Sequence, residues 1–226
     1  VTQPTAQRVA VLASCHGSVD DLDDVAAFVS NIRRGRPTPD HIVAEVRARL
    51  EHVGGSPLMR ISREQAAALE QRLDRPVRVA GRLWHPYPRA VLEELRAEGI
   101  DTIVSLPLAP QSVHIYHADV RPAAAALGLE LIEVPAWGLE PLLIAEMVNA
   151  ILEARAWLAP ADQRSSALVL SAHSLPSRII AAGDPYETDF RAMAQAVADA
   201  VREAGWGDVD VSVAFQSQGM GGGDWI

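Results

Sequence analysis

The sequence predicts an α/β protein in which parallel sheets are flanked by helices. Short apolar runs bounded by Gly, Pro or polar residues have the length and composition of buried strands. Between these runs, apolar residues recur at the three- and four-residue spacing of an amphipathic helix. A regular alternation of strands and helices favours parallel sheets, because consecutive parallel strands need a crossover between them.

Six strands are expected. The run Ala167–Leu170, which continues toward Pro176, is expected to be buried on both faces of its sheet. The second strand alternates apolar and polar residues, which is typical of a strand near a sheet edge. The expected strands cover residues 8–14, 77–83, 100–108, 129–134, 167–172 and 209–213.

Helices with one apolar face are expected between these strands. Ser62 and Gln65 have the spacing of a capping box, which predicts that a helix begins at Ser62. Asp40 is expected to cap an earlier helix. Residues 111–117 are interpreted as a polar loop, and the alanine-rich run up to Leu127 as the helix that follows it.

The prolines and polar residues around Pro107–Gln111 mark the expected domain boundary. They would divide the 226-residue chain into two halves of similar size, residues 1–108 and 109–226, with a cleft between them. Apolar residues make up 49% of the chain, which is enough for a sizeable core.

Composition excludes several classes of protein. A net charge of −9 argues against a nucleic-acid partner, which needs a basic surface. The single cysteine, Cys15, can form neither an internal disulfide nor a cysteine-based zinc site. Residues 1–8 lack the apolar core of a signal peptide, and no stretch reaches the roughly 18 apolar residues of a membrane helix. We therefore expect a soluble protein of the cytoplasm.

Histidine, arginine and hydroxyl side chains gather near the expected strand ends. His16 follows the first strand and His173 the fifth, at the edge where ligands collect in open α/β sheets. Arg33, Arg34 and Arg36, here called the arginine loop, form either a solvated loop or an anion clamp. Each residue alone is more often structural, and no zinc-protease, dinucleotide, Walker or serine-hydrolase motif accompanies them. The other members of the group are His85, Ser112, His114, Tyr116 and His117.

Several short motifs follow one another at fitting intervals along essentially the whole chain. They are Asn31–Arg36, Gly54–Leu58, Gln65–Ala66, Trp84–Pro86, Leu106–Gln111, Ser171–Pro176, Gly183–Tyr186, Phe215–Ser217 and Asp224–Trp225. Together they resemble the motifs of the ferrochelatases, which insert ferrous iron into a porphyrin during haem biosynthesis. The resemblance implies two similar Rossmann-like domains of the chelatase type, Fe²⁺ and a porphyrin as substrates, and no organic cofactor. The Arg-Arg-Gly-Arg run is most similar to the coproporphyrin III branch of Gram-positive bacteria, and protoporphyrin IX stays open as a substrate.

The resemblance also implies roles for individual residues. His173 matches the family's catalytic and metal-binding histidine. His16 stands where the coproporphyrin branch has a tyrosine that faces the porphyrin metal, so it is expected to bind both metal and porphyrin. Arg33 matches an arginine of the porphyrin pocket. Arg49 and Ser56 match rim positions that bind an anionic group of the porphyrin or a second cation such as Mg²⁺.

Two departures from the family pattern bear on activity. A family tyrosine after Trp137 is Gly138 here. Family members also continue beyond Trp225 with a strand, a loop that carries a catalytic glutamate and a terminal helix, so the chain is interpreted as C-terminally truncated. We expect it to be a poor chelatase, and less stable than a complete one. The alternatives left open are a related cobalt chelatase and a non-catalytic porphyrin or haem binder. A transient partner at a membrane surface or in the haem pathway, and the oligomeric state, are also left open.

Overall fold

A computed structural model describes residues 8–218 and 223–226, and the chain forms two compact units. The first unit extends to Pro135 and the second covers Ala136–Ile226. The boundary expected between residues 108 and 109 is therefore displaced toward the C-terminus. The reason is that strand β4 (Glu130–Glu133) pairs with β3 (Thr102–Pro107), which brings the intervening helix α5 (Val113–Ala126) into the first unit.

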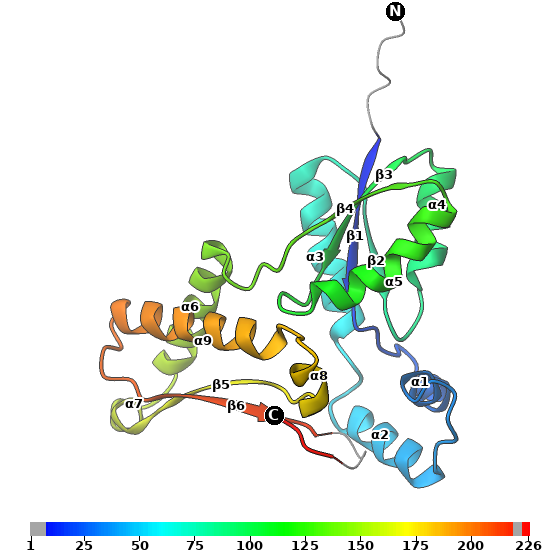
Figure 1. Cartoon of the computed structure of the whole chain (residues 1–226). Coiled ribbons are helices and arrows are strands. Elements are labelled where there is room, and N and C mark those ends of the chain that lie inside the picture. The colour runs from blue at the N-terminus through cyan, green and yellow to red at the C-terminus, as the bar shows by residue number, and fades with distance from the viewer. Residues whose placement is uncertain (1–7, 219–222) are drawn as a thin grey trace, which may run out of the picture. The chain divides into compact units, whose positions relative to one another are not determined.

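The first unit contains a four-stranded parallel sheet. Its strand order is β2-β1-β3-β4, with β1 at Val9–Cys15 and β2 at Val77–Gly81 (Figure 1). The register pairs Val11 with both Val77 and Val104. The expectation that the second strand lies at a sheet edge is thus confirmed.

Helices cover both faces of this sheet. On one face, α4 (Pro88–Ala97) and α5 bury a core that includes Leu12, Leu92 and Ile103, each 0% exposed. On the opposite face, α3 (Leu58–Leu73) packs Ala66 against Val11, Ala13 and Val77. The alternation of side chains along each strand produces these two separate cores.

A helical hairpin completes the first unit. It consists of a 3₁₀ turn, η1 (Leu22–Asp24), and the helices α1 (Val25–Ile32) and α2 (Asp40–His52). Its core contains Phe28, Val29 and Ile42 together with Trp84, which lies beyond the end of β2. The rings of Phe28 and Trp84 meet edge to face, with 5.8 Å between their centroids. Trp84 therefore joins the hairpin to the end of the sheet.

The second unit contains two parallel strands, β5 (Leu168–His173) and β6 (Val211–Gln216), which pair from Leu168↔Val211 to His173↔Gln216. One face packs against α6 (Pro141–Ala156) and α9 (Tyr186–Glu203) through residues such as Leu170 and Val197. The other face is open in the described part of the chain, where Val169 is 58% exposed. The expectation that this strand is buried on both faces is therefore wrong. Two shorter helices are α7 (Pro160–Ser165) and α8 (Ser177–Ala181).

Two predicted helix starts are also wrong. Helix α3 begins at Leu58 rather than at Ser62, because Ser56 Oγ accepts a hydrogen bond from the Leu58 amide at 3.4 Å, and Ser62 is buried inside the helix. Helix α5 begins at Val113, so most of the expected polar loop at residues 111–117 is helical. The helix expected near Asp40 is present as α2, but Asp40 is its first residue rather than its cap: the N-cap is Pro39, and no side chain caps the helix.

The six expected strands and their parallel pairing are confirmed. Residues 1–7, on which the signal-peptide argument rests, lie outside the described residues. Among the residues that are described, none of the helices combines the length and the apolar character needed to cross a bilayer.

Candidate functional site

His173 lies at the carboxyl end of β5, where the sequence places it. Its side chain is exposed on the open face of the sheet, and its partner in the register is Gln216. The next residue extends the pairing, because the Ser174 amide donates to the Gln216 carbonyl at 2.6 Å. Within residues 8–218 and 223–226, the imidazole of His173 has no hydrogen-bond partner, so both ring nitrogens are available to a substrate.

Tyr186 is the last residue of the motif Gly183–Tyr186, and the sequence predicts no role for it. Tyr186, the first residue of α9, lies near the His173 backbone. Burial raises the pKa of Tyr186, and the neighbouring His173 backbone N–H opposes the increase. The Tyr186 amide in turn donates to Asp184 Oδ1 at 3.0 Å, which fixes the start of the helix.

The loop after His173 is held by residues 224–226. Ser174 is fully buried, and its hydroxyl donates to the Ile226 carbonyl at 2.6 Å. The Ser177 amide donates to the Asp224 carbonyl at 2.8 Å, and the Ile226 amide donates to the Leu175 carbonyl at 3.1 Å. These three bonds fix the course of the chain directly after the candidate catalytic histidine.

His16 follows β1 in the first unit and is exposed. Its backbone is fixed, because the His16 carbonyl accepts from the Leu83 amide at 2.8 Å. The next residue, Gly17, has φ = 86°, and a Cβ there would lie 2.8 Å from the Trp84 amide nitrogen. Only glycine fits this position, because the conformation and the close approach both exclude a side chain. The loop thus presents His16 from a defined backbone.

The arginine loop follows α1. Arg33 is half-buried at the C-cap of α1, and its Nε is buried without a hydrogen-bond partner among the described residues. Arg36 Nε donates to the Arg33 carbonyl at 3.2 Å. In the part of the chain that the structure describes, none of the three arginines forms an ion pair, whereas Arg47 and Arg60 pair with carboxylates at about 3 Å. The loop is therefore a cationic site without an internal counter-ion.

Arg49 and Ser56 have local partners. Arg49, in the last turn of α2, is exposed and pairs with Glu45 one helical turn earlier. Ser56 is occupied by the Leu58 amide at the start of α3. A Mg²⁺ ion prefers carboxylate, carbonyl and water oxygens. A guanidinium and a hydroxyl that already accepts a hydrogen bond do not fit that preference, so these two residues fit an anion better than a cation.

Histidine and tyrosine in α5 are structural rather than exposed in a strand-exit loop. His117 is 3% exposed. Its Nε2 lies 2.9 Å from the Val134 carbonyl, which can only accept, so Nδ1 accepts from the Ser105 hydroxyl at 2.9 Å. Tyr116 is also buried, and burial raises the pKa of its hydroxyl, with Cys15 as the next contributor. His114 lies in the same helix.

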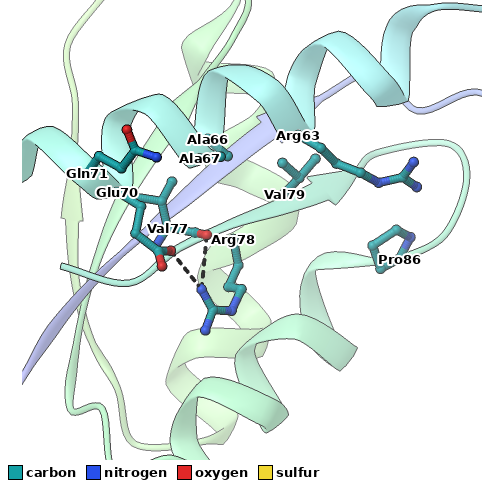
Figure 2. A pocket seen from close by; sticks show the side chains of 9 residues that line it. All are labelled: Arg63, Ala66, Ala67, Glu70, Gln71, Val77, Arg78, Val79 and Pro86. Atoms are coloured by element: carbon teal, nitrogen blue, oxygen red, sulfur yellow. Dashed lines mark hydrogen bonds and ion pairs between the residues drawn. The ribbon is translucent and has the colours of Figure 1, made fainter. Parts of the chain in front are cut away.

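A cavity in the first unit is lined by none of the candidate site residues. It has a volume of about 390 Å³ and lies between α3 and β2 in the first unit (Figure 2). In Figure 2, the side chains of Glu70 and Arg78, which both line the cavity, point toward one another, and their ion pair measures 2.9 Å. Its lining residues are Arg63, Ala66, Ala67, Glu70, Gln71, Val77, Arg78, Val79 and Pro86.

Metal-binding side chains are dispersed. Among the described residues, no three His, Cys, Asp or Glu side chains come together as a preformed metal site. The donors that the sequence predicts for the metal are two histidines, His16 in the first unit and His173 in the second.

Comparison with protein families decides the assignment. The sequence model of the ferrochelatase family matches residues 8–226, which is nearly the whole chain. The chain belongs to the ferrochelatase family. This confirms the resemblance carried by the short motifs.

Individual ferrochelatases agree with the family match. A ferrochelatase from Acidobacterium capsulatum is 33% identical, and the alignment covers 97% of this chain and 72% of that protein. A ferrochelatase from Herpetosiphon aurantiacus is 32% identical over 97% of this chain and 74% of its own length. A coproporphyrin III ferrochelatase from Oceanobacillus iheyensis is 30% identical over 97% of this chain and 73% of its own. Among solved structures, a periplasmic solute-binding protein from Actinobacillus succinogenes aligns over 92% of this chain and 58% of its own, at 13% identity and a TM-score of 0.30, too low to carry an argument.

Proposed function

We propose that this protein inserts ferrous iron into coproporphyrin III, with His173 as the catalytic residue. Membership of the ferrochelatase family supports iron insertion into a porphyrin in haem biosynthesis, and it favours neither a cobalt chelatase nor a non-catalytic haem binder. The observation that carries the assignment of His173 is its exposed imidazole, which lies at the carboxyl end of β5 without a partner among the described residues.

Metal insertion requires that two pyrrole protons leave the macrocycle and that a desolvated Fe²⁺ takes their place. A neutral imidazole accepts a proton near neutral pH and is also a good ligand for Fe²⁺. We assign to His173 the acceptance of a pyrrole proton and a contact with the incoming metal. Iron is a substrate in this scheme.

His16 is proposed as a second contact with the porphyrin metal. The His16 backbone is fixed by the hydrogen bond from the Leu83 amide and by the close packing of Gly17 against Trp84. The Cα of His16, from which the imidazole projects, therefore has a defined position. An imidazole in place of the branch's tyrosine exchanges an oxygen ligand for a nitrogen ligand, which suits ferrous iron.

The arginine loop is proposed to bind the propionates of the porphyrin. Arg33 carries a buried Nε without a partner, and in the described chain the loop has no carboxylate of its own. Coproporphyrin carries more propionates than protoporphyrin, so an unpaired cationic loop favours coproporphyrin. Arg49 and Ser56 are proposed to bind a propionate at the rim of the porphyrin pocket. Arg49 would then give up its ion pair with Glu45 and form one with the propionate. No step is assigned to Mg²⁺. The cytoplasmic location and a transient membrane-surface or haem-pathway partner stay predictions.

An anaerobic insertion assay tests this function. Fe²⁺ is supplied with coproporphyrin III or protoporphyrin IX, and haem formation is followed by absorbance for the parent and for His173→Ala. We expect slow turnover with a preference for coproporphyrin, and loss of that turnover in the variant with porphyrin affinity nearly unchanged. Binding without turnover in the parent would indicate the non-catalytic binder instead, and parental turnover in the variant would refute the role of His173.

A further inference from the structure

The outer edge of β6 carries unpaired backbone groups. The Ser174 amide donates to the Gln216 carbonyl at 2.6 Å, so the even-numbered residues of β6 direct their backbone groups toward β5 (Figure 1). Successive residues of a strand point their N–H and C=O groups to opposite edges. The N–H and C=O groups of Val211, Val213 and Phe215 therefore point away from β5, and within the described chain they have no hydrogen-bond partner. Such an edge can accept a further strand.

The outer edge of β2 in the first sheet is closed instead. The Val77 amide donates to Glu70 Oε2 at 2.9 Å, and the Val77 carbonyl accepts from Arg78 Nη1 at 3.2 Å. The Gly81 amide donates to the Pro86 carbonyl at 2.8 Å. Side chains and a turn thus cover most of this edge, which protects it from pairing with another chain. The open edge of β6 is therefore not shared by the other edge strand that has a helix beside it.

A groove of about 300 Å³ lies between β6 and α9. On the strand it is lined by Val211 and Val213, and on the helix by Arg191, Gln195 and Arg202. Arg191 and Gln195 are exposed, so this side of the helix faces solvent. The helix thus places charged and amide side chains beside the edge where a further strand would pair.

The charges on this side of α9 form a self-complementary pattern. They follow one another at spacings of three and four residues, so they lie along one side of the helix. In order they are Glu187, Arg191, the neutral Gln195, Asp199 and Arg202. In a second helix that runs in the opposite direction, Arg191 would face Asp199, Glu187 would face Arg202, and Gln195 would face its own copy. Each cation then meets a carboxylate, which indicates a second copy of this chain as the partner.

The centre of this charge pattern lies beside the middle of β6. The first turns of α9 lie at the end of β6, where Phe190 packs on Phe215 with ring centroids 5.7 Å apart. Gln195 and Val213 line the same groove further along both elements. A single two-fold axis at this point can therefore relate both the strand and the helix to their copies. Antiparallel pairing centred on Val213 would satisfy all of the unpaired N–H and C=O groups at this edge.

We propose that this protein forms a two-fold dimer in which β6 pairs antiparallel with β6 of a second copy and α9 lies beside α9 of that copy. One six-residue strand and one side of a helix make a small interface, so the association is reversible. The arrangement joins the two-stranded sheets of two chains into one four-stranded sheet.

Sedimentation velocity of the full chain between about 1 and 100 µM tests the proposal, with the mass expected to double as the concentration rises. Val213→Pro removes an outward N–H that bonds nothing within the described chain, so it should abolish the dimer and leave the β5–β6 pairing intact. Val79→Pro is the matched control, because Val79 is the middle residue of β2 and its N–H also points outward. It should leave the association unchanged. Circular dichroism confirms that both variants fold.

Charge reversal tests the two-fold geometry without changing the backbone. Arg191→Glu places two carboxylates opposite each other at both symmetric contacts, so the dissociation constant should rise about tenfold. Adding Asp199→Arg reverses the partner charge and should restore the parental constant. The control is Arg60→Glu, an exposed position on α3, which should have no effect.

Three results would overturn the proposal. A parent that stays monomeric over the whole range would leave this edge to a different partner. A Val213→Pro variant that still dimerises would place the interface elsewhere on the chain. A dimer that Val213→Pro abolishes but that the double charge reversal does not restore would have another pairing geometry, which contradicts the two-fold arrangement.

Discussion

His117 Nε2 lies 2.9 Å from the carbonyl oxygen of Val134, and this contact joins α5 to the chain that leaves β4. The other ring nitrogen bonds Ser105 on β3. We predict that His117→Ala lowers the free energy of unfolding by about 3 kcal/mol, because it leaves a cavity and removes the partner of the buried Ser105 hydroxyl and of the part-buried Val134 carbonyl. Urea denaturation measures the change. His41→Ala, an exposed histidine on α2, is the control and should have almost no effect.

Gly17→Ala should destabilise the first unit and disturb the His16 loop. The new Cβ would combine a positive φ with a 2.8 Å approach to the Trp84 amide, which predicts a cost of about 3 kcal/mol. Gly128→Ala is the matched control, because Gly128 also has a positive φ (62°) but nothing lies within 4 Å of its added Cβ. It should cost about 1 kcal/mol. Equal losses in the two variants would show that the contact with Trp84 is unimportant.

Arg33→Ala should weaken coproporphyrin binding about tenfold, since a charge-assisted hydrogen bond to a propionate is lost. Absorbance titration of the porphyrin measures the affinity. Arg33→Lys should recover part of it, because it keeps the charge but not the planar fork. Arg60→Ala is the control: Arg60 already pairs with Glu64 on α3. A salt-independent, parental affinity of Arg33→Ala would contradict the proposed propionate contact.

His16→Ala should change the absorption spectrum of haem bound to the protein. Removal of an imidazole from the iron alters the ligand field, so the Soret band is expected to shift. Exposed His52 on α2 provides the comparison, and His52→Ala should give the parental spectrum. Identical spectra for His16→Ala and the parent would place His16 outside the metal's coordination.

The stability of the first unit should depend on Glu133 at acid pH. Arg121 holds both carboxylate oxygens, at 2.5 and 2.7 Å, and lowers the pKa of Glu133 below its ordinary value of 4.5. A group with a lowered folded-state pKa contributes stability above its unfolded pKa, and this stability is lost as the pH falls through the folded pKa. Glu133→Gln should therefore reduce the melting temperature slightly at pH 7 and have little effect near pH 3. A difference that persists unchanged to pH 3 would rule out this linkage.

Much of the fold follows from local sequence patterns. The six strands were predictable because apolar runs and turn residues are contiguous in the chain, and the family was predictable from motifs spread along it. The start of α5 was not predictable, because the hydrogen-bond partners of its polar side chains are far away in the sequence. His117, for example, bonds Ser105 on β3 and the Val134 carbonyl after β4. A local pattern contains no information about such partners.

The same limit applies to Ser62 and to β5. Ser62 and Gln65 have capping spacing, yet the helix begins a turn earlier, and Ser62 is packed into the core at 2% exposure. The apolar run at Leu168 packs on one side only, although its composition fits burial on both. For the site, the positions of His16 and His173 after strands were predictable. The proximity of Tyr186 to the His173 backbone was not, since it brings the start of a helix close to the end of a strand.

The position of Trp84 between two loops of the first unit has a consequence for how the sequence can evolve. Its backbone approaches Gly17, next to His16, while its indole packs edge to face on Phe28 of α1, the helix that ends at Arg33. A substitution that shifts the indole alters the His16 loop and the base of the arginine loop at once. The two proposed substrate contacts of the first unit are thus expected to show epistasis: exchange of His16 for another residue, or remodelling of the arginine loop, would be tolerated most readily together with compensating changes around Trp84.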